Sequence, residues 1–127
     1  MNRTRPAVLW GLWLPVALYA LVIFTASAFP QPEMPITFWS FDKILHLAEY
    51  GLFGILLSRA IKGTAPGINL KRLCLLVTII ALGYGVTDEF HQLLVPGRMF
   101  SGWDMLSDGF GGFLGALLIR VRPSRDK

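Results

Sequence analysis

The sequence predicts an all-α membrane protein, a four-transmembrane-helix bundle, and three observations support this fold class. The chain is 54% hydrophobic and 16% charged, whereas about 25% of the residues in a typical soluble protein are charged. Its apolar residues form runs of about 18 or more, which as helices would cross ~30 Å of hydrocarbon. The basic residues flank these runs, as in membrane topology. A length of 127 residues corresponds to a single domain, 1–127.

Four spans follow from the apolar runs, and helix-ending residues separate them. The spans are about 7–29, 44–61, 70–94 and 103–121. The first two connections are rich in residues that end helices, namely Pro30, Pro32, Pro35, Gly63, Pro66 and Gly67. Pro96 and Gly97 form the third connection. Ser101 and Asp104 have the spacing of a capping box, which marks the start of the fourth helix.

The first span partly resembles a secretory signal peptide. Arg3 and Arg5 precede it, and Ala26-Ser27-Ala28 resembles a peptidase site. The run is longer than the usual signal-peptide core of about 7–15 residues. It also contains Trp10 and Trp13. We therefore expect an uncleaved membrane helix.

The distribution of cations predicts the orientation. Of the 12 lysines and arginines, all except Lys43 and Arg98 fall on one side of a four-span chain. Because basic residues are enriched on the cytoplasmic side, both termini are expected in the cytoplasm. The loops 30–42 and 95–102 would then face outward. The same flanking pattern makes nucleic acid an unexpected partner, although the net charge is +4.

Ionisable residues concentrate in or beside the apolar spans. Six of the eight acidic residues and both histidines lie there: Asp42, Glu49, Asp88, Glu89, Asp104, Asp108, His46 and His91. Charged groups are costly in hydrocarbon, so each is a candidate for a functional site.

Helical spacing arranges these groups in three stripes at the outer ends of three helices. The stripes are Asp42, His46 and Glu49; Tyr84, Asp88 and Gln92; and Asp104 and Asp108. Helical rise puts Glu49, Asp88 and Asp108 within ~10 Å of the outer interface. Gly111 and Gly115 continue the last stripe, and such small residues let helices approach closely. We expect the stripes to face a shared interior, with the first helix outside them.

Negative charge exceeds positive charge in this cluster, because only Lys43 and Arg98 are fixed cations there. A partly buried cluster cannot keep that excess without compensation. Three outcomes are open: some carboxyls are protonated, a divalent metal binds, or a cationic ligand group binds. The candidate metal ligands are His46, Glu49 and Asp88, although their spacing is not diagnostic of a metal.

Structural roles compete with functional ones at several of these positions. Asp42 and Asp104 would each cap a helix. Glu89 would pair with Arg98, which otherwise pairs with Asp104 or binds a phosphate or carboxylate. These residues are therefore candidates for binding, with a structural alternative for each.

Other polar residues are expected to pack. Tyr50 and Tyr84 would pack with one hydrogen bond each, and His91 would be solvated or packed. Gln92 would form a hydrogen bond across helices, worth about 1 kcal/mol.

Three sequence blocks resemble the VanZ-like family of membrane proteins. They are Asp42-Lys43-x-x-His46-x-x-Glu49-Tyr50, Asp88-Glu89-x-x-Gln92-x-x-x-Pro96-Gly97-Arg98, and Asp104 followed by Gly111 and Gly115. Asp108 departs from the pattern, in which an asparagine is expected. The resemblance implies a multi-pass protein of the bacterial cytoplasmic membrane. It also implies a cell-envelope role associated with resistance to the glycopeptide teicoplanin, without naming a reaction.

Two function hypotheses remain in balance. The first is a non-catalytic module that binds membrane lipids, a lipid-linked wall precursor or a lipoglycopeptide. The second is an outer-leaflet hydrolase or transferase in which His46, Glu49 and Asp88 are catalytic, with or without a metal. In both hypotheses the candidate binding residues are Asp42, Glu89, Gln92, Arg98, Asp104 and Asp108.

Two further expectations concern chemistry. No serine or cysteine is expected beside a histidine, so an activated side-chain nucleophile is not predicted. A proton-coupled transporter is a third hypothesis. The one-sided cluster and the absence of an inverted repeat weigh against it.

Overall fold

The structure is a computed structural model that describes residues 5–29 and 39–120, and its regular elements are all helical. The helices are α1 (Arg5–Ser27), α2 (Trp39–Thr64), α3 (Leu70–Gln92) and α4 (Gly102–Arg120). The prediction of an all-α chain with four long helices is confirmed. The three prolines predicted to break the chain after α1 lie outside the described residues.

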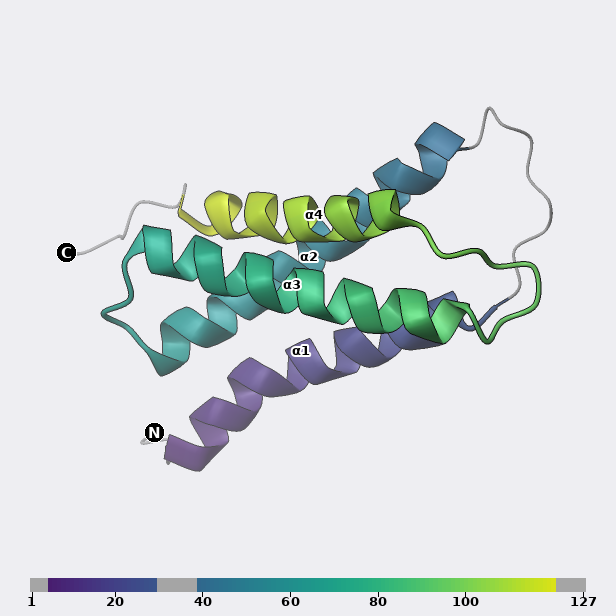
Figure 1. Ribbon diagram of the computed structural model, residues 1–127. Coiled ribbons are helices and arrows are strands. Elements are labelled where there is room, and N and C mark those ends of the chain that lie inside the picture. The colour runs from purple at the N-terminus through teal and green to yellow at the C-terminus, as the bar shows by residue number, and fades with distance from the viewer. Residues whose placement is uncertain (1–4, 30–38, 121–127) are drawn as a thin grey trace.

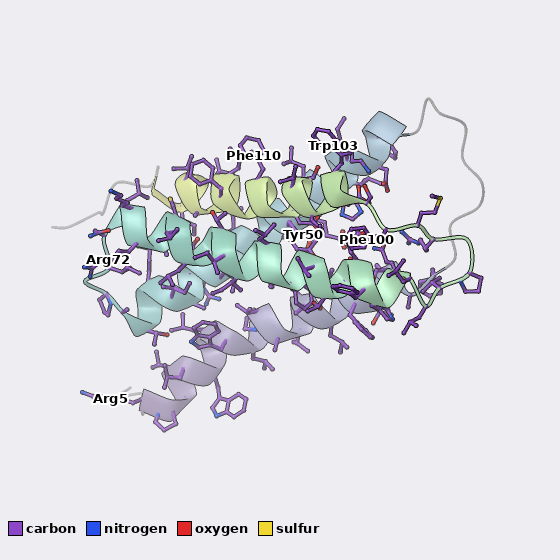
Figure 2. The ribbon with its side chains drawn as sticks, viewed as in Figure 1. Arg5, Tyr50, Arg72, Phe100, Trp103 and Phe110 are labelled. Atoms are coloured by element: carbon purple, nitrogen blue, oxygen red, sulfur yellow. The ribbon has the colours of Figure 1, made fainter. Side chains whose placement is uncertain are left out.

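The helices alternate in direction, so the bundle has two distinct ends (Figure 1). The start of α1, the end of α2, the start of α3 and the end of α4 lie at one end. Arg5 and Arg72 mark this end in Figure 2. α1 and α4 each pack against α2 and α3, on opposite sides of that pair.

Glycines bring α2 and α4 into close contact. A Cβ atom built at Gly54 would overlap the backbone of Gly112, and one at Gly115 would overlap the carbonyl oxygen of Gly51. A Cβ atom at Gly111 would lie 2.6 Å from another carbonyl oxygen of α2. The predicted small-residue stripe on α4 is therefore a helix–helix interface, where backbone meets backbone.

The bundle buries several polar side chains and exposes many large apolar ones. Fully or nearly buried polar side chains include His46, Asp88, Glu89, Gln92, Asp104 and Asp108. Large apolar side chains are exposed on every helix, among them Leu18, Leu21, Leu52, Ile79, Phe110 and Leu118. A water-soluble monomer rarely exposes so much contiguous apolar surface.

Three of the helices are long and apolar enough to cross a membrane. They are Arg5–Ser27, the Phe41–Thr64 part of α2, and Leu70–Gln92. α4 is not among them. Together with the exposed apolar surface, this makes the chain a multi-pass membrane protein.

Aromatic side chains fill the centre of the bundle. Tyr50 is fully buried between the helices (Figure 2). Its ring meets Phe53 edge-on, with 5.9 Å between ring centroids. Tyr84 donates its predicted hydrogen bond, to the carbonyl oxygen of Ala20. The hydrogen bond predicted for Tyr50 is wrong, because its hydroxyl has no partner among the described residues.

Candidate functional site

A pocket of about 520 Å³ lies between α1, α2 and α3. It is formed by the end of α1, the first turns of α2 and the end of α3. It therefore lies at the end of the bundle opposite Arg5 and Arg72. Six of the nine predicted site residues line it: Asp42, His46, Glu49, Asp88, Gln92 and Arg98.

His46 separates this pocket from a second group of polar side chains on α4. Its Nδ1 atom lies 2.8 Å from Oδ1 of Asp108, and its Nε2 atom lies 3.8 Å from Oδ2 of Asp104. An ionised carboxylate only accepts hydrogen bonds, so Nδ1 donates to Asp108 whenever that carboxyl is ionised. This contact orients the ring and defines its tautomer, as a carboxylate does for many functional histidines.

Asp108 is fully buried behind His46, in space that a glycine provides. A Cβ atom at Gly85 would lie 2.6 Å from Oδ2 of Asp108. That same oxygen has no hydrogen-bond partner among the described residues. The residue that departs from the expected family pattern is thus an acid placed deep inside the bundle and bonded to His46.

Asp104 lies between His46 and a lysine. The ammonium group of Lys43 pairs with Asp104 and lies 3.5 Å from Oδ2 of Asp42. Asp42, His46 and Asp104 each offer one metal-ligand atom, and these atoms lie within 4.8 Å of one another. One imidazole nitrogen and two carboxylate oxygens suit several divalent metals. This group differs from the predicted set, because it contains Asp104 and Asp42 in place of Glu49 and Asp88.

Asp88 is held by two neutral donors. The hydroxyl of Ser27 donates to its Oδ1, and the amide of Gln92 donates to its Oδ2 at 3.1 Å. Gln92 bonds within α3, not across helices as predicted. Ser27 is the last residue of α1 and lines the pocket. The expectation that α1 lies outside the polar stripes is therefore wrong at this end.

Ser27 also corrects the expectation that no serine lies beside a histidine. Its Oγ is 3.4 Å from Nδ1 of His91. His91 stacks on Phe24 with 4.0 Å between ring centroids, as expected for a packing histidine. In the sequence, Ser27 belongs to Ala26-Ser27-Ala28, which resembles a signal-peptidase cleavage site. A small polar residue at the end of a span is the signal in the sequence that Ser27 belongs to the site.

Glu89 and Arg98 do not form the ion pair considered above. Glu89 is fully buried and accepts a hydrogen bond from the backbone of Ser101 at 2.9 Å. The hydroxyl of Ser101 accepts from the backbone of Asp104, so the predicted cap of α4 is present. In a capping box the acid three residues after the cap accepts a hydrogen bond from the backbone N–H of the cap residue. Here Glu89 accepts that bond in place of Asp104, so the Asp104 carboxylate pairs with Lys43 instead. Arg98 donates instead to the carbonyl oxygen of Phe29.

Glu49 and Asp42 complete the pocket. The Glu49 side chain is partly buried, and no described residue donates a hydrogen bond or forms an ion pair with its carboxylate. Tyr19 bonds only to its backbone oxygen, at 2.9 Å. α2 begins three residues before Asp42, so Asp42 lies in its first turn and is not the cap. An acid in this position is favoured by the helix dipole.

Comparison with known proteins gives one family. A family model described as VanZ/LLP1 matches residues 11–122, which include all three motif blocks. The resemblance seen in the motifs is therefore confirmed over most of the chain. No curated protein and no solved structure matches.

Proposed function

This chain belongs to the VanZ/LLP1 family, and from that premise we propose that it binds an amphiphile in the bacterial cytoplasmic membrane. The pocket would hold the polar part of a lipid-linked envelope component or of an amphiphilic antibiotic. The chain would cross the membrane four times, with both termini in the cytoplasm and the pocket near the outer face.

The amphiphile proposal depends on one observation, which is that the pocket combines a polar wall with an apolar rim. Carboxylates, an imidazole and a guanidinium form the wall of the pocket. Ala26, Leu45 and Ala48 also line the pocket, and because they are exposed on the surface we call them its rim. α1 and α2 also expose large apolar side chains close in sequence to this rim, such as Phe24 and Ile44. A head group in the pocket would therefore leave its acyl chains against hydrocarbon-facing surface.

Two features support the fourth span. α4 has 19 residues, so it is ~28 Å long at ~1.5 Å per residue. Its acids are buried, while Trp103 and Phe110 project from its outer side (Figure 2). Several basic residues of the described ranges, such as Arg5, Lys62 and Arg72, lie at the end opposite the pocket. Because basic residues are enriched on the cytoplasmic side of membrane proteins, this supports a cytoplasmic position for that end.

The amphiphile hypothesis can be tested with purified protein in lipid nanodiscs. Binding of an undecaprenyl-linked wall precursor and of teicoplanin would be measured for the wild type and for Asp88→Asn. Arg72→Gln, at the far end, is the control. We expect roughly tenfold weaker binding of at least one ligand for Asp88→Asn, and no change for the control. Equal affinities for all three proteins would reject the pocket as the binding site.

A second function is favoured by the contact between His46 and Asp108. A histidine oriented by a buried carboxylate is the arrangement used in general acid–base catalysis. The chain would then hydrolyse or transfer part of an envelope lipid, with His46 as the base and Asp108 as its positioning residue. Glu49 and Asp88 would contact the substrate.

The catalytic hypothesis has its own test, which is turnover. Envelope lipids incubated with the protein would be analysed for products by mass spectrometry. If the enzyme hypothesis holds, His46→Ala should lower the rate by about 10²–10⁴-fold. If wild-type protein releases no product while the pocket binds lipid, the binding function stands and the catalytic one does not.

A further inference from the structure

The pocket has charges of opposite sign at different positions. Glu49 and Asp88 line it from α2 and α3, and Arg98 lines it from the segment after α3. All three residues line this one pocket, so their charged groups are accessible to a single ligand. A purely cationic or purely anionic ligand would match only one part of this lining.

Hydrogen bonds position the Arg98 side chain, but no carboxylate among the described residues neutralises its charge. Its Nε and Nη2 atoms donate to the carbonyl oxygen of Phe29, at 3.3 Å and 3.2 Å. This carbonyl follows the end of α1 and fixes the guanidinium beside the pocket. Arg98 forms no ion pair with any carboxylate in residues 5–29 and 39–120. Its remaining N–H groups and its charge therefore suit an anionic oxygen such as that of a phosphate.

Neither Glu49 nor Asp88 forms an ion pair with a cation among the described residues. Glu49 receives no hydrogen bond or ion pair at its carboxylate from the described residues. Within the described part of the chain, Asp88 receives hydrogen bonds only from the neutral groups of Ser27 and Gln92. These groups satisfy part of its hydrogen-bonding capacity but not its charge. A ligand ammonium that still bears N–H donors would satisfy both requirements at once.

We propose that this pocket binds the zwitterionic phosphoethanolamine head group of an aminophospholipid. The primary ammonium would lie at Glu49 and Asp88, and the phosphate at Arg98. The acyl chains would leave over the exposed rim at Leu45 and Ala48. This inference rests on the function proposed above, because it names the head-group chemistry that the same pocket would take.

The head group fits the pocket in size and in hydrogen bonding. A volume of about 520 Å³ falls within the range of roughly 300–1,000 Å³ found for small-molecule sites. A choline head group has the same charge but no N–H donor for the carboxylates. A glycerol head group has no cation and would place its phosphate in a pocket with excess negative charge.

A series of short-chain lipids tests the inference on wild-type protein. Dihexanoyl phosphatidylethanolamine, its N-methyl and N,N-dimethyl forms, phosphatidylcholine and phosphatidylglycerol would be titrated calorimetrically against protein in detergent. Affinity should fall stepwise as methyl groups replace N–H donors. We expect the ethanolamine lipid to bind roughly tenfold more tightly than the choline and glycerol lipids.

Variants then assign the two ends of the head group. Glu49→Gln keeps the shape of the side chain and should remove most of the preference for ethanolamine over choline. Arg98→Gln should weaken both lipids by a similar factor, and Arg98→Lys should restore part of the affinity. Arg72→Gln removes a single charge at the opposite end of the bundle and should leave both affinities unchanged.

Two outcomes overturn the inference in different ways. If the pocket variants weaken lipid binding but the glycerol or choline lipid binds as tightly as the ethanolamine lipid, the head-group assignment fails and the proposed function stands. If neither Glu49→Gln nor Arg98→Gln changes the binding of any lipid, both fail.

Free phosphoethanolamine, added as a competitor, distinguishes the source of the head group. Given the ethanolamine preference, displacement of the lipid by the free compound supports recognition of the head group from either source. Absence of displacement supports the lipid as the ligand, because the acyl chains then contribute to binding.

Discussion

His46 contacts two groups of side chains that sequence spacing alone places in a single cluster. On one side it lines the pocket with Glu49 and Asp88. On the other it bonds to Asp108 at 2.8 Å. The consequence is a division of roles within the predicted site. Pocket residues are available to a ligand, whereas Asp108 is fully buried and acts through His46.

Removing the Asp108 carboxylate should destabilise the protein. Asp108→Ala leaves the Nδ1 hydrogen of His46 without its acceptor in a buried position. We expect a loss of about 3 kcal/mol in the free energy of unfolding, measured by denaturant titration in detergent. Asp108→Asn keeps an acceptor oxygen and should cost less than half as much. Equal stability of Asp108→Ala and the wild type would contradict the buried contact.

Two tyrosine variants form a matched pair. Tyr50→Phe removes a hydroxyl that has no partner among the described residues, so stability should stay the same or rise slightly. Tyr84→Phe removes a hydrogen bond to the carbonyl oxygen of Ala20 and should cost about 1 kcal/mol. Thermal unfolding of both variants in one detergent provides the measurement. A larger loss of stability for Tyr50→Phe than for Tyr84→Phe would contradict the conclusion that only the Tyr84 hydroxyl is hydrogen-bonded within the described residues.

Among the elements, α2 and α4 form the closest helix pair, and this pairing positions the site. Glycines remove the side chains that would separate the two backbones. The approach places Asp104 and Asp108 beside His46. α3 contributes the cap of α4 through Glu89, whose carboxylate accepts from the backbone of Ser101. The start of α4 is thus positioned by α2 and by α3 together.

Adding a methyl group at the α2–α4 interface should separate the helices. Gly54→Ala would place a Cβ atom against the backbone of Gly112, which cannot move as a flexible side chain can. We expect a loss of about 1–3 kcal/mol in stability. Gly83→Ala is the control, because nothing lies within 4 Å of its added Cβ atom.

The control substitution should leave stability unchanged or slightly increased, since alanine favours a helix over glycine. Unfolding curves of the two variants and of the wild type would be compared under the same conditions. Similar behaviour of Gly54→Ala and Gly83→Ala would exclude close α2–α4 packing.

Among the described residues, the molecule buries His46 and four acids and exposes many of its large apolar side chains. This distribution is suited to hydrocarbon, in which buried polar groups must find partners within the protein. Figure 1 shows that successive helices run in opposite directions along the bundle. Arg5 and Arg72 share one end, and the pocket lies at the other. The proposed topology therefore assigns one end to each side of the membrane.

Cysteine labelling in intact cells tests that topology. Cys74 is buried and would first be replaced by serine. Met99 is 84% exposed in the connection between α3 and α4, and Gly67 lies in the connection between α2 and α3. An impermeant maleimide should label Met99→Cys in intact cells. It should label Gly67→Cys only after the membrane is permeabilised. The opposite pattern would invert the orientation.

Much of the fold is encoded locally and was therefore predictable from the sequence. The apolar runs predict four helices, and the observed ends differ from the predicted ones by a few residues, except at the start of α2. Helical periodicity also predicts which side chains share a face, because a turn has the same geometry in every α-helix. For this reason the stripe of Asp42, His46 and Glu49 lines one pocket as expected.

Contacts between helices are not encoded locally, and there the predictions fail or remain open. The roles of Ser27, Glu89 and Arg98 depend on which helix lies opposite, and all three bond to residues distant in sequence. Periodicity shows which residues share a face, but not which neighbour that face meets.

The sequence by itself therefore determined the membrane class, the four helices and the polar stripe on each of three helices. Hydrophobic run length and helical period suffice for these properties, because each depends on residues within one segment. Only the tertiary structure decided that His46 separates a pocket from a buried acid and that α1 contributes Ser27. Those outcomes depend on which helices pack together and on how closely glycines allow their backbones to approach. Such packing is a property of a pair of helices and not of a single helix.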